Sequence, residues 1–402
     1  MKSYKHTFIL VTILVLLIVL FVNQPSSIFG DQPTTGDVSL IRDDFELDVY
    51  YQRIGYFYDK EIPFQSDRVE YPVLGLFYLT IPTLLTNTQA DYDIALIFQN
   101  IIFLIILVIL TSKIIKILGR DNRQMWLFIL PSILFFTINR FDIFPAVLIQ
   151  LALLLILKKK YGWSFVLLSL SFLAKGYAMV LFPVFFVYYL VQRNSKIKGL
   201  LLNRPFLLFS IPAVIIVIGL MFWAGFENAL FPYIFQSTRN FAYGSVYAIF
   251  ISANWNFFVD GFWKWYMFIG SKILGVLQLV LPFIIYVGYK KFKQYIKTPT
   301  NLIMWSLLVL SFYIFLSPYY SPQWFLWLLP LLVLLPLNKK EVWLIIVYDL
   351  LNFIFFPVIY RYIGYESYIF DIVVFIRSLV FILILLMVVK KIYNQDNTMQ
   401  KI

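Results

Sequence analysis

Long apolar segments alternate with short polar segments along most of the chain, and the apolar segments have the length of membrane-spanning helices. A spanning helix needs about 20 predominantly apolar residues, and somewhat fewer when polar side chains at its ends reach the interface. The pattern predicts an all-α polytopic membrane protein, a bundle of about twelve transmembrane helices, in which residues 1–402 form a single integral membrane domain. The predicted spans lie near residues 7–22, 94–112, 125–138, 143–157, 162–174, 177–191, 206–224, 272–289, 301–316, 324–337, 342–358 and 370–389.

One further apolar stretch, residues 72–86, decides the predicted topology. It is shorter than a typical span, and Pro72 and Pro82 interrupt it. If it crossed the membrane, the basic segment 113–123 would lie outside the cell, and every later basic cluster would change side. We therefore predict a re-entrant or interfacial helix here, with both termini of this multi-pass cell-membrane protein in the cytoplasm.

Basic residues gather in short clusters between the predicted spans. On the predicted topology all of these clusters are cytoplasmic, in agreement with the positive-inside rule. The formal charge of +12 is therefore explained by topology, and no nucleic-acid partner is expected. The clusters are Lys113, Lys116, Arg120 and Arg123; Lys158 to Lys160; Arg193, Lys196, Lys198 and Arg204; Lys290, Lys291, Lys293 and Lys297; Lys339 and Lys340; Lys390 and Lys391.

Composition agrees with a lipid environment and narrows the available chemistry. Hydrophobic residues make up 61% of the chain and charged residues 13%, whereas soluble proteins carry about 25% charged residues. The chain has no cysteine, which excludes disulfides, thiolate nucleophiles and cysteine-ligated metals. Its only histidine is His6, at the edge of the first apolar segment, so imidazole acid–base chemistry is excluded as well. Catalysis would depend on carboxylates, lysine, arginine, tyrosine or hydroxyl groups.

Two long segments are predicted on the external face. The first, residues 23–93, includes the predicted re-entrant helix, and its part 23–71 carries ten of the 21 acidic residues. The second, residues 225–271, is rich in aromatic side chains, which favour the membrane interface. Candidate reactive groups therefore gather on one non-cytoplasmic face.

Several charged or polar residues interrupt apolar segments on this face. A lysine at membrane depth, such as Lys175, costs about 2.5–3.5 kcal/mol on insertion scales, so it needs a partner or a function. Arg140 and Asp142 share a short turn, in which they either pair for structure or form part of a site. Lys175 has the same structural alternative, an ion pair with Asp142. Arg239 lies in the second external segment, and Gln323 follows a Ser-Pro turn that either only breaks a helix or contributes to a site.

Short motifs between residues 43 and 330 carry most of these groups. They are Asp-Val-Tyr-Tyr (48–51), Glu-Tyr-Pro-Val-Leu (70–74), Arg-Phe-Asp-Ile (140–143), Ala-Lys-Gly-Tyr (174–177), Arg239 with Gly244-Ser245, and Ser-Pro-Gln-Trp-Phe-Leu-Trp-Leu-Leu-Pro (321–330). In this order they resemble the lipid-linked sugar-dependent glycosyltransferases of the GT-C superfamily, in particular glycosyltransferase family 87. Enzymes of this type place large external loops after the first and seventh spans, where the two external segments are predicted here.

The resemblance implies transfer of a sugar, mannose in the family, from a polyprenyl-phosphate-linked donor to a lipid or glycan acceptor. Lys175 and Arg239 would bind the donor phosphate, because cations stabilise a phosphate leaving group. The family's catalytic acid lies in the first external loop, which implies Asp44 or Asp48 as general base, with Asp43 as a third candidate. No cofactor is expected, although the adjacent Asp43 and Asp44 leave a divalent metal as an alternative. The remaining substrate-binding candidates are Arg140, Asp142, Glu70, Tyr71, Tyr50 and Gln323.

Other classes of membrane protein remain as alternatives. A secondary transporter shares the twelve-span layout, but transporters show internal repeats and place polar groups at the midplane. In this chain no duplicated pattern is evident, and the polar residues gather at one face. A polysaccharide polymerase or ligase shares the external loops and the lipid-linked substrate, and composition does not separate it from a transferase. A purely structural membrane protein would not need Lys175.

Overall fold

The computed structural model describes residues 42–55, 63–65, 68–194, 203–242, 244–252 and 266–400, and all regular secondary structure within them is helical. The predicted first span, 7–22, lies outside the described residues, as do residues 23–41 of the first external segment and 253–265 of the second.

The helices and their bounds, including 3-10 and π segments (η), are as follows. They are α2 (Asp44–Ile54), α3 (Val73–Thr80), η2 (Ile81–Leu84), α4 (Gln89–Ile117), η3 (Asn122–Ile129), α5 (Pro131–Asn139), α6 (Ile143–Leu157), α7 (Tyr161–Ala174), η4 (Gly176–Leu181), α8 (Phe182–Gln192), α9 (Arg204–Ala224), α10 (Phe226–Thr238), η5 (Val246–Ile251), η6 (Tyr266–Gly270), α12 (Ser271–Val287), α13 (Tyr289–Phe292), α14 (Pro299–Phe315), η7 (Pro322–Trp324), α15 (Phe325–Leu332), α16 (Lys339–Phe353), η8 (Ile354–Ile359), α17 (Tyr360–Tyr362) and α18 (Tyr368–Gln400).

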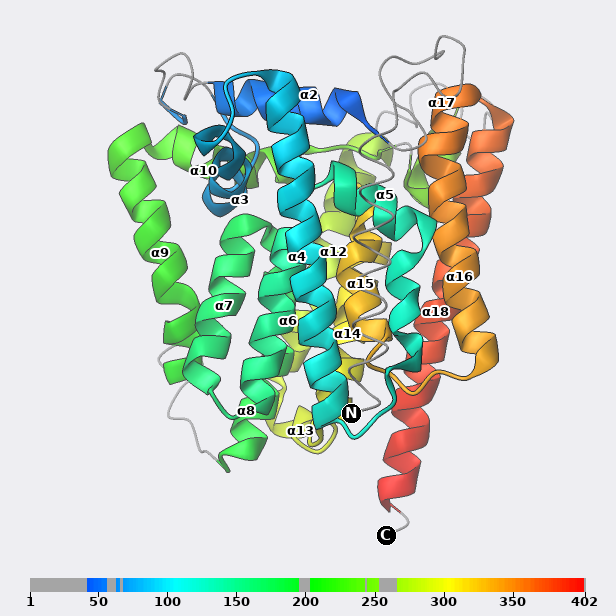
Figure 1. Ribbon diagram of the computed structural model, residues 1–402. Helices are drawn as coiled ribbons and strands as arrows, with labels where there is room; N and C mark the ends of the chain where they lie inside the picture. The colour runs from blue at the N-terminus through cyan, green and yellow to red at the C-terminus, as the bar shows by residue number, and fades with distance from the viewer. Residues whose placement is uncertain are drawn as a thin grey trace.

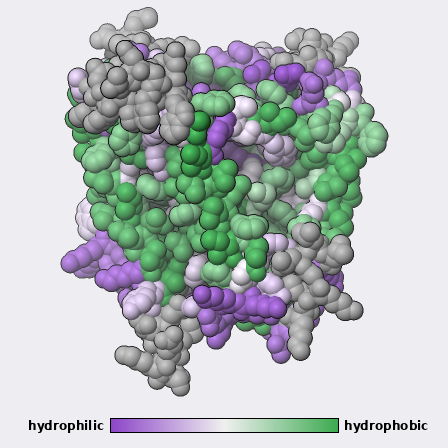
Figure 2. All heavy atoms as spheres, turned by 180° about the vertical axis from the view of Figure 1, so that it is seen from behind, coloured by the Kyte–Doolittle hydropathy of each residue, from purple (hydrophilic) through white to green (hydrophobic). Residues whose placement is uncertain are grey.

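Most of these helices run side by side along one axis, and α2 lies across one end of the bundle (Figure 1). We call this the α2 end, and we call the opposite end, where α13 lies, the α13 end. Figure 2 shows an apolar band across the middle of the face it views, with polar residues gathered toward the two ends. The large central cluster of buried side chains is built mainly by α4, α5, α6, α8, α14 and α15. This distribution is that of a protein whose sides face lipid.

Five helical segments are long and apolar enough to cross a membrane by length and composition, among the described residues. They are Gln89–Ile117, Arg204–Ala224, Tyr266–Val287, Lys339–Tyr362 and Tyr368–Gln395. The pair α5 and α6 passes the same test together but bends by 108°, which makes it a sixth span or a re-entrant loop. Within the described residues, the predicted spans 162–174, 177–191, 301–316 and 324–337 correspond to shorter apolar helices. The predicted total of twelve spans is therefore not reproduced by helix length, and it stays a prediction.

The stretch 72–86 forms two short helices, α3 and η2, that lie at the α2 end (Figure 1). Tyr92, in the first turn of α4, donates a hydrogen bond to the carbonyl oxygen of Leu79 at 3.0 Å. Gly75 allows α3 to approach the end of α7, because a Cβ atom at this position would lie 2.7 Å from the carbonyl oxygen of Ala174. These contacts hold α3 beside the start of α4 and the end of α7.

Three breaks in apolar helices meet at the α2 end. The first separates α5 from α6, where Arg140 adopts an extended conformation with φ −138° and ψ 140°. The second follows α7, where Lys175 is extended with φ −162° and ψ 121°. The third separates α14 from α15, where Pro318 and Pro322 prevent the helix from continuing. Extended residues cannot bond within a helix, so these breaks leave polar side chains and backbone groups available at one end of the bundle.

Candidate functional site

Asp142 is the centre of a buried polar network at the α5–α6 break. The ammonium group of Lys175 donates to both of its carboxylate oxygens, at 2.7 Å each. Gln323 donates through its side-chain nitrogen at 3.1 Å, and Trp327 donates through its indole nitrogen at 2.9 Å. Asp142 is fully buried, so this set of four donated hydrogen bonds compensates its loss of hydration.

Arg140 forms a second buried ion pair, next to the first. Its Nη2 atom pairs with the carboxylate of Asp43, and its Nη1 atom donates to the carbonyl oxygen of Asn139 at 3.0 Å. Its Nε atom donates to the side-chain oxygen of Gln323 at 2.8 Å. Since Gln323 also donates to Asp142, this one amide joins the two ion pairs. The network therefore connects α2, the α5–α6 break, the end of α7 and the start of α15.

Asp43 reaches Arg140 because it is the N-cap of α2. Its side chain accepts a hydrogen bond from the backbone N–H of Glu46 at 3.3 Å, which is the usual role of an N-cap aspartate. Its own backbone N–H donates to the side-chain oxygen of Asn139 at 2.8 Å. The side chain of Asp43 is 2% exposed. Asp43 is thus held at both its backbone and its carboxylate.

Glu46 is a carboxylate of this site that the sequence analysis did not single out. Its Oε2 atom lies 4.0 Å from Nη2 of Arg140, and its side chain is 23% exposed. Burial raises the pKa of Tyr50 and of Tyr71 well above the ordinary value, and the nearby charge of Glu46 raises both further. The spacing Asp43-x-x-Glu46 is that of a helix capping box, and it could have indicated that both acids share the first turn of one helix.

The other two acids predicted as bases lie away from Arg140. Asp44 pairs with Arg42, which also pairs with Asp93 at 2.6 Å. Asp48 accepts a hydrogen bond from Gln89. On an α-helix, positions separated by three, four and seven residues share a face, so the face that carries Asp43 does not carry these two acids. Asp43 and Asp44 have different cationic partners and are not gathered around one position.

Aromatic rings surround the buried end of Lys175. Its ammonium group lies 4.8 Å from the ring centre of Phe141 and 5.5 Å from that of Trp327. Phe141 packs edge-on against Tyr50 and Tyr71, with ring centres 5.8 and 5.4 Å away. The hydroxyl group of Tyr50 is buried and has no hydrogen-bond partner among the described residues. A polar atom of this kind, beside two ion pairs, is a candidate contact for a bound substrate.

The remaining predicted binding residues lie around this network. Glu70 forms an ion pair with Arg53 at 2.8 Å. Arg239, at the end of α10, lies over the ring of Tyr319 with 4.1 Å from the guanidinium carbon to the ring centre. Tyr319 belongs to the same turn as Gln323, but no contact joins Arg239 to Lys175 in the part of the chain that the structure describes. The structure thus brings Lys175, Arg140, Asp142, Gln323, Asp43, Tyr50 and Tyr71 together, and it leaves Asp44, Asp48, Glu70 and Arg239 outside the hydrogen-bonded network.

Metal ligands do not gather in the described residues: no group of three Asp, Glu, His or Cys side chains there could hold an ion. The expectation that no cofactor is needed stays a prediction. Comparison with protein families, with curated proteins and with solved structures found no match for this chain.

Proposed function

We propose that this protein is a membrane glycosyltransferase that transfers a sugar from a polyprenyl-phosphate-linked donor to a lipid or glycan acceptor. Mannose is the sugar that the sequence resemblance suggests. The observation that carries the proposal is the single amide of Gln323, which bonds to both Arg140 and Asp142 and so joins two buried ion pairs. Three of the motifs behind the resemblance, at residues 140–143, 174–177 and 321–330, contribute side chains to this network. A fourth motif, residues 48–51, lies on α2, the helix that Asp43 caps. For a purely structural role, the ion pairs Lys175–Asp142 and Arg140–Asp43 would not need a side chain that joins them.

The donor phosphate would bind at Lys175. An ammonium group has three hydrogens, and Asp142 accepts two of them. The side chain of Lys175 is 22% exposed, and the third hydrogen of its ammonium group has no acceptor among the described residues, which leaves it for a ligand. A charge-assisted hydrogen bond from this ammonium would stabilise the negative charge that develops on the leaving phosphate. Arg239 is a second cation on the same side of the bundle, and it has no carboxylate within ion-pair distance among the described residues.

The general base would be a carboxylate of the first turn of α2. Asp43 is saturated by Arg140 and by its own helix, whereas the side chain of Glu46 accepts no hydrogen bond within the described part of the chain. Glu46 is also the more exposed of the two, at 23% against 2%. In the proposed step this carboxylate takes the proton of the acceptor hydroxyl. The acceptor oxygen then bonds to the anomeric carbon, the bond from that carbon to the phosphate oxygen breaks, and polyprenyl phosphate leaves.

The proposal is tested by incubating the purified protein in lipid bilayers with polyprenyl-phosphate sugars and a panel of lipid and glycan acceptors. We expect the release of polyprenyl phosphate together with a glycosylated acceptor. The Lys175→Met variant should lose this release. Uptake of the lipid-linked sugar without release of polyprenyl phosphate would identify a transporter and overturn the proposal.

A further inference from the structure

A concave site lies at the α13 end, far from the network around Asp142. It is a groove of about 620 Å³ between the start of α7, the end of α8 and the start of α9. Six of its lining residues define what we call the basic groove: Lys159, Lys160, Tyr161, Trp163, Arg193 and Arg204. None of the described residues that line it is acidic, so its charge is strongly positive. The proposed transfer reaction uses none of these residues.

The helices around the basic groove place positive charge where it is unfavourable for the helices themselves. Lys160 is the N-cap of α7 and Arg204 is the first residue of α9, and neither helix has an acidic residue in its first turn. The N-terminus of a helix carries a partial positive charge, so cations there oppose the helix dipole. A bound anion would offset this unfavourable arrangement, because it would interact favourably with the two cations and with the two helix ends.

The backbone of Lys159 is a further unusual feature. This residue follows Lys158, the C-cap of α6, and lies in the left-handed region with φ +60°, a conformation that glycine or asparagine adopts most readily. The backbone N–H of Lys160 closes the turn by bonding to the carbonyl oxygen of Leu155 at 2.8 Å. This turn leads directly into α7 and places Lys159 and Lys160 together in the lining of the basic groove.

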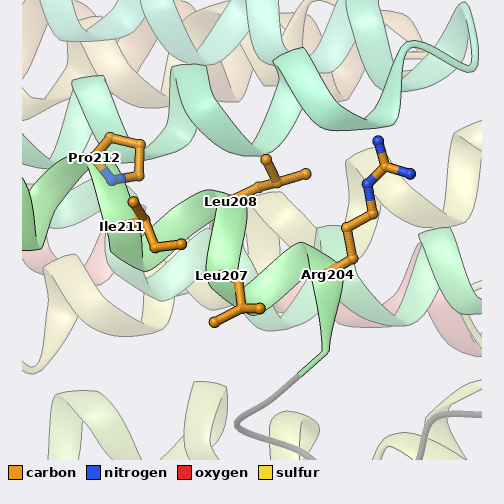
Figure 3. Close-up of a pocket in the computed structure, with 5 residues that line it drawn as sticks. All are labelled: Arg204, Leu207, Leu208, Ile211 and Pro212. Carbon is orange, nitrogen blue, oxygen red and sulfur yellow. The ribbon is translucent and has the colours of Figure 1, made fainter.

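An apolar groove continues from the basic groove along α9. It has a volume of about 470 Å³, and it shares Arg204 and Leu208 with the basic groove. Figure 3 shows its five lining residues on α9, with Arg204 beyond Leu208 at the start of the helix and Ile211 and Pro212 further along. Ile211 is 48% exposed and Trp163 is 67% exposed. An exposed tryptophan beside cations is typical of the headgroup depth of a bilayer. An exposed apolar face nearer the middle of the bundle is typical of acyl-chain depth.

We propose that the basic groove binds the headgroup of an anionic phospholipid, with one acyl chain along the apolar groove of α9. The charge of the groove complements a phosphodiester, and basic pockets between membrane helices are known to suit such headgroups. A polyprenyl phosphate that serves the network around Asp142 would have its phosphate at the α2 end of the bundle. The occupant of this groove has its phosphate at the α13 end, which favours a phospholipid of the opposite leaflet.

The test measures lipid binding and needs no sugar transfer, so it succeeds or fails independently of the proposed function. Delipidated protein in neutral detergent is titrated with phosphatidylglycerol, with phosphatidylcholine and with polyprenyl phosphate, and bound lipid is counted by native mass spectrometry. We expect phosphatidylglycerol to bind and phosphatidylcholine not to bind. Lys160→Gln with Arg204→Gln should weaken binding by about fivefold for each charge removed, or about 25-fold together.

The matched control removes two lysines at the same end of the bundle but outside the groove. Lys339→Gln with Lys340→Gln changes the net charge equally, and these residues begin α16, away from α7 and α9. The control should bind phosphatidylglycerol as the unchanged protein does. Equal weakening in both double variants would show unspecific attraction and overturn the proposal, as would a loss of polyprenyl phosphate binding in the Lys160→Gln, Arg204→Gln variant that is larger than its loss of phosphatidylglycerol binding. If the first double variant fails to fold, Arg204→Gln alone carries the same test with a fivefold expectation.

Discussion

Lys175 donates a hydrogen bond to each carboxylate oxygen of Asp142, and both distances are 2.7 Å. The carboxylate is fully buried, so the pair satisfies a charge that could not otherwise be accommodated there. The same pair leaves one hydrogen of the ammonium group unused. A role in stability and a role in binding therefore coexist in one side chain, and substitutions can separate them.

Lys175→Met should lower both stability and sugar transfer. It removes the only cation that bonds to Asp142 among the described residues, and breaking a buried pair costs about 3–5 kcal/mol. The double change Lys175→Met with Asp142→Asn should recover most of the lost stability, because the asparagine oxygen still accepts from Trp327 and carries no charge. Melting temperature and turnover are measured on both variants. Full turnover in the double variant would exclude a role of Lys175 in donor binding.

Glu46→Gln should nearly abolish transfer with little change in melting temperature. Glutamine keeps the size of the side chain but cannot take a proton, and loss of a general base lowers the rate by about 10²–10⁴-fold. The matched control is Asp44→Asn, two residues earlier on α2, where Asp44 pairs with Arg42 outside the network. The control should keep most of the activity. Wild-type turnover in the Glu46 variant would remove this residue from the mechanism.

Asp43→Asn should instead act mainly on stability. Asparagine caps a helix about as well as aspartate, so α2 should stay capped while Arg140 loses its charged partner. We expect a loss of about 3–5 kcal/mol in the free energy of unfolding, because Arg140 is buried. Chemical denaturation and turnover are compared on the same preparation. An inactive variant with unchanged stability would make Asp43 the base in place of Glu46.

The sequence was sufficient to locate many of the helices and three of the breaks. The predicted spans 143–157 and 162–174 nearly coincide with α6 and α7, because each apolar run is bounded by charged or polar residues. The breaks at Arg140, Lys175 and Gln323 were predicted for the same reason. The length of an apolar run and the residues that break a helix are local signals, so they can be recognised without knowledge of the fold.

The pairing of side chains could not be predicted in the same way. Asp43 and Arg140 are almost one hundred positions apart, and their contact depends on which acid caps α2. A shift of one residue, from Asp43 to Asp44, turns the carboxylate to another face of the helix and to another partner, Arg42. The number of spans was equally hard to predict, because several apolar helices here are shorter than a membrane is thick.

Gly75→Ala should destabilise the protein by displacing α3 from the end of α7. The added Cβ atom would lie 2.7 Å from the carbonyl oxygen of Ala174 and 3.2 Å from the ring of Phe141, and a backbone oxygen has little freedom to move. Since Phe141 lies beside Lys175, turnover should fall with stability. The control is Gly219→Ala in α9, where a Cβ atom meets nothing within 4 Å. Alanine there should leave the melting temperature unchanged or raise it, because helical glycine is unfavourable by about 0.5–1 kcal/mol.

The last prediction concerns the side of the membrane on which each end of the bundle lies. The chain has no cysteine, so single cysteines can be labelled without background. Phe45 on α2 is 62% exposed, and the side chain of Arg123, which follows α4, is 87% exposed. If α3 and η2 do not cross the membrane, Phe45→Cys should react with an impermeant reagent added outside intact cells. Arg123→Cys should react only after the cells are opened, because α4 alone separates the two positions.

The alternative makes a different prediction for the same pair of variants. If residues 72–86 crossed the membrane, two spans would separate Phe45 from Arg123, and both cysteines would react from outside. Asp121→Cys, whose side chain is 56% exposed and next to Arg123, provides a second position with the same expectation. Labelling of either position 121 or 123 from outside would contradict the topology, and it would also place the basic groove in the external leaflet. The measurement thus decides which leaflet supplies the lipid for that groove as well as which face carries the network around Asp142.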